Sequence, residues 1–240
     1  MVARTIEQLR QTAENISQRG GTALAVAADI STAAGTETVK GQVETHFGPP
    51  AILVNAAGIF GPLQRIAASD PQRWIETLTI NAVGPYRMCR AFAAGMVAQG
   101  WGRIINYSSA AAFHPPGPLV SAYATSKVAL NQLTRHLAAE LKATGVTANV
   151  LHPGDVKTSM WADIRREAEE LGEEGEGYRS WVRWVDETGG DSPVKAADLV
   201  LKLVGDEAGG VTGQFLWIED GLQAPIASWD APEDDRPWKD

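Results

Sequence analysis

Hydrophobic positions along this chain follow two alternating spacings. Short, mostly apolar runs are typical of strands buried within a sheet, and they occur at residues 23–28, 51–54, 103–107, 146–151 and 215–218. Between these runs, apolar residues recur every three or four positions, as on one face of an amphipathic helix. This second pattern predicts helices that begin near Thr5 and Asp70, a helix carrying Val39, Val43 and Phe47, and helices over about residues 86–97, 123–143 and 193–204.

Strands that alternate with helices predict an α/β fold with a doubly wound parallel sheet covered by helices on both faces. We expect a single Rossmann-like domain over residues 1–222 and an acidic tail over residues 223–240. Ligands of such sheets bind beyond the carboxyl ends of the strands. Polar residues and glycines follow the predicted strands at Asp29, residues 55–58, Ser109 and Pro153-Gly154, so we expect the functional site at that edge.

Composition narrows the class of protein. The 240 residues suit one α/β domain, and 44% hydrophobic residues allow a sizeable core. A net charge of -8 argues against nucleic acid and anionic membrane as partners. No apolar run reaches the ~18 residues that a membrane span needs, and residues 1–4 carry no signal-peptide pattern. The single cysteine, Cys89, excludes an internal disulfide and is expected to be a buried side chain. We therefore expect a cytoplasmic protein.

Tyr123 and Lys127 lie four residues apart on a predicted helix and so share a face. An ammonium near a phenol stabilises the phenolate and lowers the tyrosine pKa from about 10, which favours proton exchange with an alcohol or carbonyl. The spacing alone equally describes a solvent-facing pair. Ser109 ends the preceding strand and can donate a hydrogen bond to a substrate oxygen in the same place, although a turn or cap serine is the alternative.

Asn81 stands where one predicted helix gives way to the next, so it is either a helix cap or part of the site. The four histidines are scattered without the spacing of metal ligands, and no metal site is predicted.

These residues together resemble the short-chain dehydrogenase/reductase family. The resemblance rests on Asn55-Ala56-Ala57-Gly58, Asn81, Ser109, Tyr123-x-x-x-Lys127 and Pro153-Gly154-x-x-x-Thr158, in this order, and it covers residues 1 to about 222. Members are NAD(P)-dependent oxidoreductases that act on alcohols or ketones.

The resemblance implies a role for each matched residue. Tyr123 is the expected general acid/base, Lys127 is expected to lower the tyrosine pKa and bind the nicotinamide ribose, Ser109 to orient the substrate oxygen, and Asn81 to hold a water of a proton relay. Asn55, Ala56, Ala57 and Gly58 are expected to support the central strand and line the adenosine side. Asp29 is expected to bind the adenine amino group, with Ile30 beside the ring, and Pro153, Gly154, Val156 and Thr158 to contact the nicotinamide.

The chain departs from the family at its beginning. The family's first strand carries a Thr-Gly-x-x-x-Gly-x-Gly turn whose backbone N–H groups meet the cofactor pyrophosphate. That turn is absent, and Gly20-Gly21 follows a helix rather than a strand. We expect the domain to lack the first strand and helix, about 30 to 40 residues of a strand–helix–strand unit. A misassigned start, a fragmentary gene and a shortened protein that has lost catalysis all remain possible explanations.

Arg4 follows the expected second strand of the family, where an arginine often faces the 2′-phosphate of NADP. This favours NADP(H) over NAD(H), although an exposed residue before a helix is the alternative.

The segment at residues 159–192 is polar and charged yet holds Trp161, Trp181 and Trp184, which with Tyr178 could form a lid over the substrate or simply pack a helix against the body. Its glutamates are expected to be a solvated face. The long helices represented by residues 81–98 and 123–143 imply, by analogy with the family, a homodimer or homotetramer.

Two other functions remain open. A non-catalytic regulatory or assembly protein is favoured by the missing glycine turn and opposed by the retained Ser109, Tyr123 and Lys127. A dehalogenase-like relative with a Ser-Tyr-Arg set is disfavoured because position 127 is lysine.

Overall fold

The structure, a computed structural model, describes residues 1–113 and 117–218. The predicted acidic tail and the last four residues of the predicted domain lie outside the described residues. The strands are β1 (Val2–Ala3), β2 (Val26–Ala27), β3 (Ile52–Asn55), β4 (Gly102–Tyr107), β5 (Val146–His152) and β6 (Phe215–Trp217). The α-helices are α1 (Ile6–Gln18), α2 (Ala33–Phe47), α3 (Pro71–Leu78), α4 (Gly84–Gln99), α5 (Ser121–Glu140), α6 (Ser159–Glu170), α7 (Glu176–Thr188) and α8 (Pro193–Val204).

The strands form two parallel sheets. One holds β1 and β2, and the other has the order β3-β4-β5-β6. Every pairing is parallel, and the longest runs from Gly102 opposite Val146 to Tyr107 opposite Leu151. The predicted α/β class is therefore confirmed. Among the described residues no strand joins β1 to β3 by hydrogen bonds. We expected a domain without the family's first strand.

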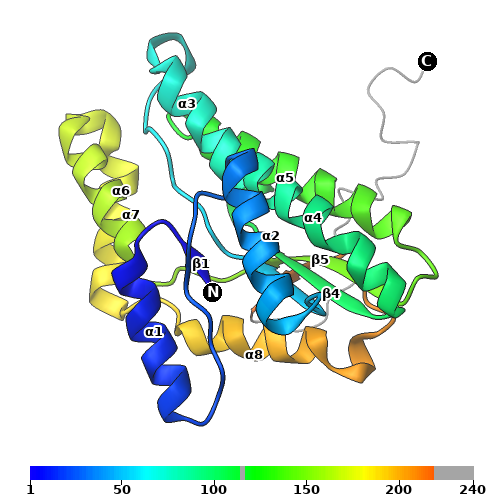
Figure 1. The fold of residues 1–240 in the computed structure, drawn as a ribbon. Helices are drawn as coiled ribbons and strands as arrows, with labels where there is room; N and C mark the ends of the chain where they lie inside the picture. The colour runs from blue at the N-terminus through cyan, green and yellow to red at the C-terminus, as the bar shows by residue number, and fades with distance from the viewer. Residues whose placement is uncertain (114–116, 219–240) are drawn as a thin grey trace, which may run out of the picture.

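Helices cover both faces of the strands. Helices α2, α4 and α5 lie on one side, and α1 and α8 lie on the other (Figure 1). On the first side, Met88, Phe92 and Met96 of α4 pack with Ile104 and Ala148 of the sheet. On the second side, Leu199 and Leu203 of α8 pack against Leu216 and Ile105. These two layers fix the carboxyl ends of β3, β4 and β5 beside one another.

Several predicted elements differ in detail. The strand expected over residues 23–28 is reduced to Val26–Ala27. Thr5 is the N-cap residue of α1, where a helix was expected to begin, but its side chain makes no cap hydrogen bond. Asp70, by contrast, accepts hydrogen bonds from the backbone of Gln72 and Arg73, as a capping aspartate before Pro71 should.

The prediction that the β3 run is buried on both faces is wrong. Leu53 is 8% exposed, but Ile52 and Val54 are 43% and 41% exposed. Alternate side chains of a strand point to opposite faces, so one face of β3 is covered and the other is not. The covered face contacts the core with α4, whereas Ile52 and Val54 on the other face are exposed.

The polar segment at residues 159–192 is helical. Helices α6 and α7 pack against each other at one side of the molecule, outside the two layers (Figure 1). Among the described residues, no helix is both long enough and apolar enough to cross a bilayer.

Two leucines on α8 test how far the core explains stability. Leu203 is 1% exposed and Leu201 is 66% exposed. We expect Leu203→Ala to lower the free energy of unfolding by about 2–5 kcal/mol, because it removes buried apolar contacts and leaves a cavity. Leu201→Ala, the same change two residues away, should alter it by less than about 0.5 kcal/mol. Urea denaturation followed by circular dichroism measures both, and equal losses would contradict the packing described.

Candidate active site

Tyr123 and Lys127 project from the first two turns of α5 and are buried, with exposures of 9% and 5%. The Nζ atom of Lys127 donates to the backbone carbonyl of Tyr107, at 2.9 Å, where β4 ends. The same nitrogen lies 5.4 Å from the centroid of the Tyr123 ring. The carboxyl end of β4 therefore holds the ammonium in place beneath the phenol.

Ser109 lies beside this pair. Its side chain caps the 3-10 helix Ala110–Ala112 by accepting from the backbone N–H of Ala111, and it also hydrogen-bonds Tyr123. The two roles considered for Ser109 from the sequence are thus compatible. A hydroxyl fixed by its own turn is well placed to share a substrate oxygen with the phenol.

Burial dominates the electrostatics of the pair. It raises the pKa of Tyr123 to about 12; the hydrogen bond from Ser109 acts in the opposite direction, and the nearby Asp155 carboxylate adds to the rise. Burial also lowers the pKa of Lys127 to about 8. Burial of the phenol therefore dominates its pKa in this arrangement, and the lowering expected from Lys127 stays a prediction.

Asn81 lies fully buried in a π-helical turn, Thr79–Val83, between α3 and α4. Its side chain bonds both the N–H and the C=O of Ile59 and donates to the hydroxyl of Ser126, at 3.0 Å. A Cβ atom at Gly58 would lie 3.2 Å from the Asn81 Oδ1 atom and 3.7 Å from the Lys127 Nζ atom. Asn81 therefore ties the loop after β3 to α5, directly beside the buried lysine, and π-helical turns are frequent at functional sites.

Asn55 supports the sheet as expected. Its amide donates to the Oδ1 atom of Asn106 at 2.8 Å, and Asn106 in turn donates to the Thr134 hydroxyl. Cys89, also in contact with Asn55, is 3% exposed, and burial raises the pKa of its thiol to about 12. The expectation that Cys89 is a buried side chain is confirmed.

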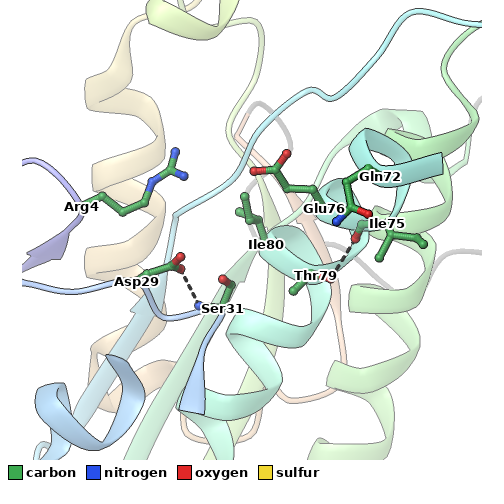
Figure 2. A pocket seen from close by; sticks show the side chains of 8 residues that line it. All are labelled: Arg4, Asp29, Ser31, Gln72, Ile75, Glu76, Thr79 and Ile80. Atoms are coloured by element: carbon green, nitrogen blue, oxygen red, sulfur yellow. Dashed lines mark hydrogen bonds between the residues drawn. The ribbon is translucent and has the colours of Figure 1, made fainter. Parts of the chain in front are cut away.

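A pocket of about 380 Å³ opens beyond the carboxyl ends of β1 and β2. Figure 2 shows that Arg4, Asp29 and Glu76 direct their side chains into one space from three different elements. The backbone N–H of Ser31 donates to Asp29 at 2.9 Å. Hydrogen bonds from Ser31 and the charge of Arg4 hold the pKa of Asp29 below its ordinary value. The pocket thus combines the Arg4 guanidinium with the side chains of Asp29 and Glu76.

The sequence analysis named two residues of this pocket and missed the others, which are Ser31, Gln72, Ile75, Glu76, Thr79 and Ile80. Most come from α3 and the π-helical turn, and their spacing of three and four residues is the only signal in the sequence that places them on one face. Ile30 does not line the pocket and instead lies against Gly84, within 3.4–3.5 Å of where a Cβ would stand there. Ala56 and Ala57 lie at the end of β3, outside this lining, and are exposed.

The loop after β5 is fixed by backbone contacts. Gly154 has a φ of +78°, a conformation that favours glycine. Val156 pairs with Gly190, and its carbonyl accepts from the Trp161 indole at 2.6 Å. Thr158 begins α6 as its N-cap residue without a side-chain cap bond, and it is exposed.

Aromatic side chains close over the tyrosine. Phe60 stacks on Tyr123 with ring centroids 4.6 Å apart, and Tyr178 and Trp181 of α7 both lie 6.4 Å from Phe60. Trp161 contacts Trp181 at 4.3 Å. Trp184 is different: it is 48% exposed and so does not belong to the expected lid. The glutamates of the segment at residues 159–192 are exposed as expected, apart from Glu167. That side chain is half-buried and forms an ion pair with Arg73. Among the described residues, no group of three or more histidine, cysteine or acidic side chains could hold a metal ion.

Comparison with known proteins agrees with this geometry. The family described as "short chain dehydrogenase" matches residues 1–169. A short chain dehydrogenase of Pseudocercospora fijiensis is 36% identical over 163 residues, covering 67% of this chain and 52% of that protein. The short-chain reductase protein NovJ of Streptomyces niveus is 34% identical over 222 residues, covering 92% of this chain and 82% of that protein. Among solved structures, L-sorbose reductase of Gluconobacter frateurii, complexed with NADPH and L-sorbose, is similar with a TM-score of 0.77 at 26% identity, covering 94% of this chain and 86% of that one.

The buried lysine predicts a pH dependence of stability. Its pKa falls from 10.5 to about 8 on folding, so between these values the unfolded chain binds more protons and stability rises with pH. Lys127→Met removes this dependence. We expect the free energy of unfolding of the variant, relative to wild type, to be higher at pH 7 than at pH 10, by on the order of 3 kcal/mol. Urea denaturation at both pH values measures it. Lys142→Met, which removes the same charge at an exposed position, is the matched control.

Proposed function

Because this chain belongs to the short-chain dehydrogenase family, whose members are NAD(P)-dependent oxidoreductases, we propose that it transfers a hydride between a nicotinamide cofactor and an alcohol or ketone, with Tyr123 as the general acid/base. The observation that carries the proposal is that the half-buried Ser109 lies beside the buried Tyr123 and Lys127. The two hydroxyls are hydrogen-bonded to each other, and the amine lies one helical turn away.

The protonation states suit the reduction of a carbonyl. A tyrosine with a pKa of about 12 keeps its proton at neutral pH and can donate it to an oxygen that gains negative charge. Ser109 would donate a second hydrogen bond to that oxygen, and Lys127, close to its own pKa of about 8, would accept or return a proton beneath the phenol. The aromatic side chains around Tyr123 would exclude water during the transfer.

The residues fit both ends of a nicotinamide cofactor. Arg4, Asp29 and Ser31 of the 380 Å³ pocket would hold the adenosine, with the Arg4 guanidinium suited to a 2′-phosphate. This favours NADP(H) over NAD(H). At the other end, Lys127 would bind the ribose hydroxyls, and Pro153, Gly154, Val156 and Thr158 would contact the nicotinamide. The cofactor supplies the hydride, and the chain supplies orientation and the proton.

One part of the cofactor site is not found. Within residues 1–113 and 117–218, no glycine-rich turn connects a strand to a helix beside the pocket. The cofactor would therefore be held mainly through its adenosine and nicotinamide ends rather than through its pyrophosphate. This observation favours the second candidate function, a regulatory or assembly protein of the same fold that does not turn over a substrate.

For the oligomeric state we propose a homodimer or homotetramer through α4 and α5, whose outer faces expose Tyr86, Val97 and Val128.

Tyr123→Phe separates the two candidate functions. The change removes only the hydroxyl, so we expect turnover of a ketone with NADPH to fall by about 10²–10⁴-fold while the NADPH dissociation constant stays within about twofold. Absorbance at the reduced-nicotinamide band measures turnover, and quenching of tryptophan emission measures binding. Wild-type turnover that survives the substitution would refute the catalytic assignment, whereas a wild-type chain that binds no cofactor would favour the non-catalytic candidate.

Arg4→Ala tests the cofactor preference. Loss of a charge-assisted bond to the 2′-phosphate should weaken NADPH binding by about tenfold or more and leave NADH binding nearly unchanged. Isothermal titration of both cofactors measures the ratio. Arg10→Ala, which removes the same charge from an exposed position on α1, should leave it as in wild type. An equal loss for both cofactors would contradict the 2′-phosphate assignment.

A further inference from the structure

A second pocket, of about 320 Å³, lies between helices α2 and α4, which pack against each other (Figure 1). Its lining comes from the first two turns of each helix and includes Thr36, Glu37, Tyr86, Arg87 and Arg90. It shares no residue with the lining of the 380 Å³ pocket, so the two pockets are separate places on the molecule.

Two guanidinium groups of this second pocket have no carboxylate partner. Arg87 and Arg90 lie three residues apart on one face of α4, and neither forms an ion pair or a hydrogen bond with any described residue. The arginines of α6 and α7 differ in this respect, because each of them forms an ion pair with an aspartate or a glutamate.

Arg87 is partly buried as well as unpaired. Its side chain is half-buried, and its Nε atom is shielded from solvent without meeting an acceptor among the described residues. A buried donor without an acceptor is costly, and where one persists in a folded protein an ion or a water molecule often supplies the acceptor. An anion in the pocket that Arg87 lines would supply the acceptor that the described part of the chain does not.

The charge of the lining also favours an anion. Among the described lining residues Glu37 is the only carboxylate, against the two guanidinium groups, so the lining is net positive in a chain whose net charge is -8. The pocket borders the first turn of α2, a helix of 15 residues whose N-terminal end carries a partial positive charge. Tyr86, which is 47% exposed, adds a hydroxyl that can donate a hydrogen bond.

We propose that this pocket binds a phosphate group, either free or as part of a small phosphate monoester, through the guanidinium groups of Arg87 and Arg90. Arginine suits phosphate because its planar fork donates two parallel hydrogen bonds to neighbouring oxygens. A volume of about 320 Å³ lies at the lower end of the range for small-molecule pockets, so it leaves room for a compact organic group beside the phosphate. The proposal does not depend on the proposed function, because the pocket contains no residue of the candidate active site.

Isothermal titration with inorganic phosphate and with phenyl phosphate tests the site. The Arg4→Ala chain is the parent throughout, so that phosphate held by Arg4 in the other pocket does not contribute. At an ionic strength of about 0.15 M we expect one site per chain with a Kd of about 1 mM or tighter. Tighter binding of phenyl phosphate would identify a monoester as the ligand, and tighter binding of inorganic phosphate would identify the free ion. Binding of neither would overturn the proposal.

Three substitutions in the same parent locate the site. Arg87→Met keeps a long apolar stem and removes the guanidinium, Arg90→Gln removes the second one from an exposed position, and each should weaken binding by about tenfold or more. Glu37→Gln removes the opposing charge and should tighten binding by about threefold, a gain that general damage to the fold would not produce.

Arg10→Gln, at an exposed position on α1, is the matched control and should leave the Kd within about twofold. An equal loss in this control, or an unchanged Kd in Arg90→Gln, would contradict the site. Because Tyr86 also lies on the face proposed for the oligomer interface, sedimentation velocity accompanies each titration. Weakened binding at an unchanged oligomeric state supports direct contact, whereas weakening only where the oligomer dissociates would overturn it.

Discussion

The buried ammonium of Lys127 is the constraint on which the site depends. A charge that is 5% exposed needs a polar partner, and the carbonyl of Tyr107 provides one at the exact point where β4 stops pairing. To reach that carbonyl, the first turns of α5 must lie across the carboxyl end of the sheet. That placement brings Tyr123 beside Ser109 and puts Gly58 next to the lysine, where a Cβ atom would lie 3.7 Å from the Lys127 Nζ atom and 3.2 Å from the Asn81 Oδ1 atom.

A second set of polar contacts keeps the neighbouring strands in register with this arrangement. Asn55 and Asn106 bond each other across β3 and β4, and Asn106 reaches α5 through Thr134. Asn81 likewise joins two elements, because it hydrogen-bonds both the loop after β3 and Ser126 of α5. Because each of these amides is buried, breaking one bond leaves a group without water to replace it. The polar core therefore specifies the geometry of the site, while the apolar layers on either side mainly supply stability.

The sequence predicted most of this fold because the strongest signals are local. Asp70-Pro71 begins a helix at the predicted residue, and α8 spans the residues that its apolar spacing indicated. The edge of the sheet that carries the candidate site was predictable for a different reason: residues that end successive parallel strands meet at one edge. The sequence did not predict features that depend on contacts with residues far along the chain. Ile52 and Val54 look like core residues in sequence, yet their exposure depends on what packs on that face of β3. Likewise, whether Glu76 faces a pocket depends on how α3 is rotated against β1 and β2.

The tyrosine pKa shows why the sign of an effect cannot be taken from residue identity alone. A lysine four residues away should favour the phenolate, but the same packing that buries the lysine also removes water from the phenol. Loss of water disfavours the charged phenolate directly. The Lys127 ammonium, by contrast, lies 5.4 Å from the centroid of the Tyr123 ring and is already hydrogen-bonded to a carbonyl. The closed aromatic lid therefore keeps water away from the phenol and holds the pKa of Tyr123 above its ordinary value. Any opening of α6 and α7 that admitted water or a polar ligand would reduce the desolvation and lower the pKa of Tyr123 toward its ordinary value of about 10. In this fold, access to the site and the acidity of its tyrosine are thus controlled by the same helices.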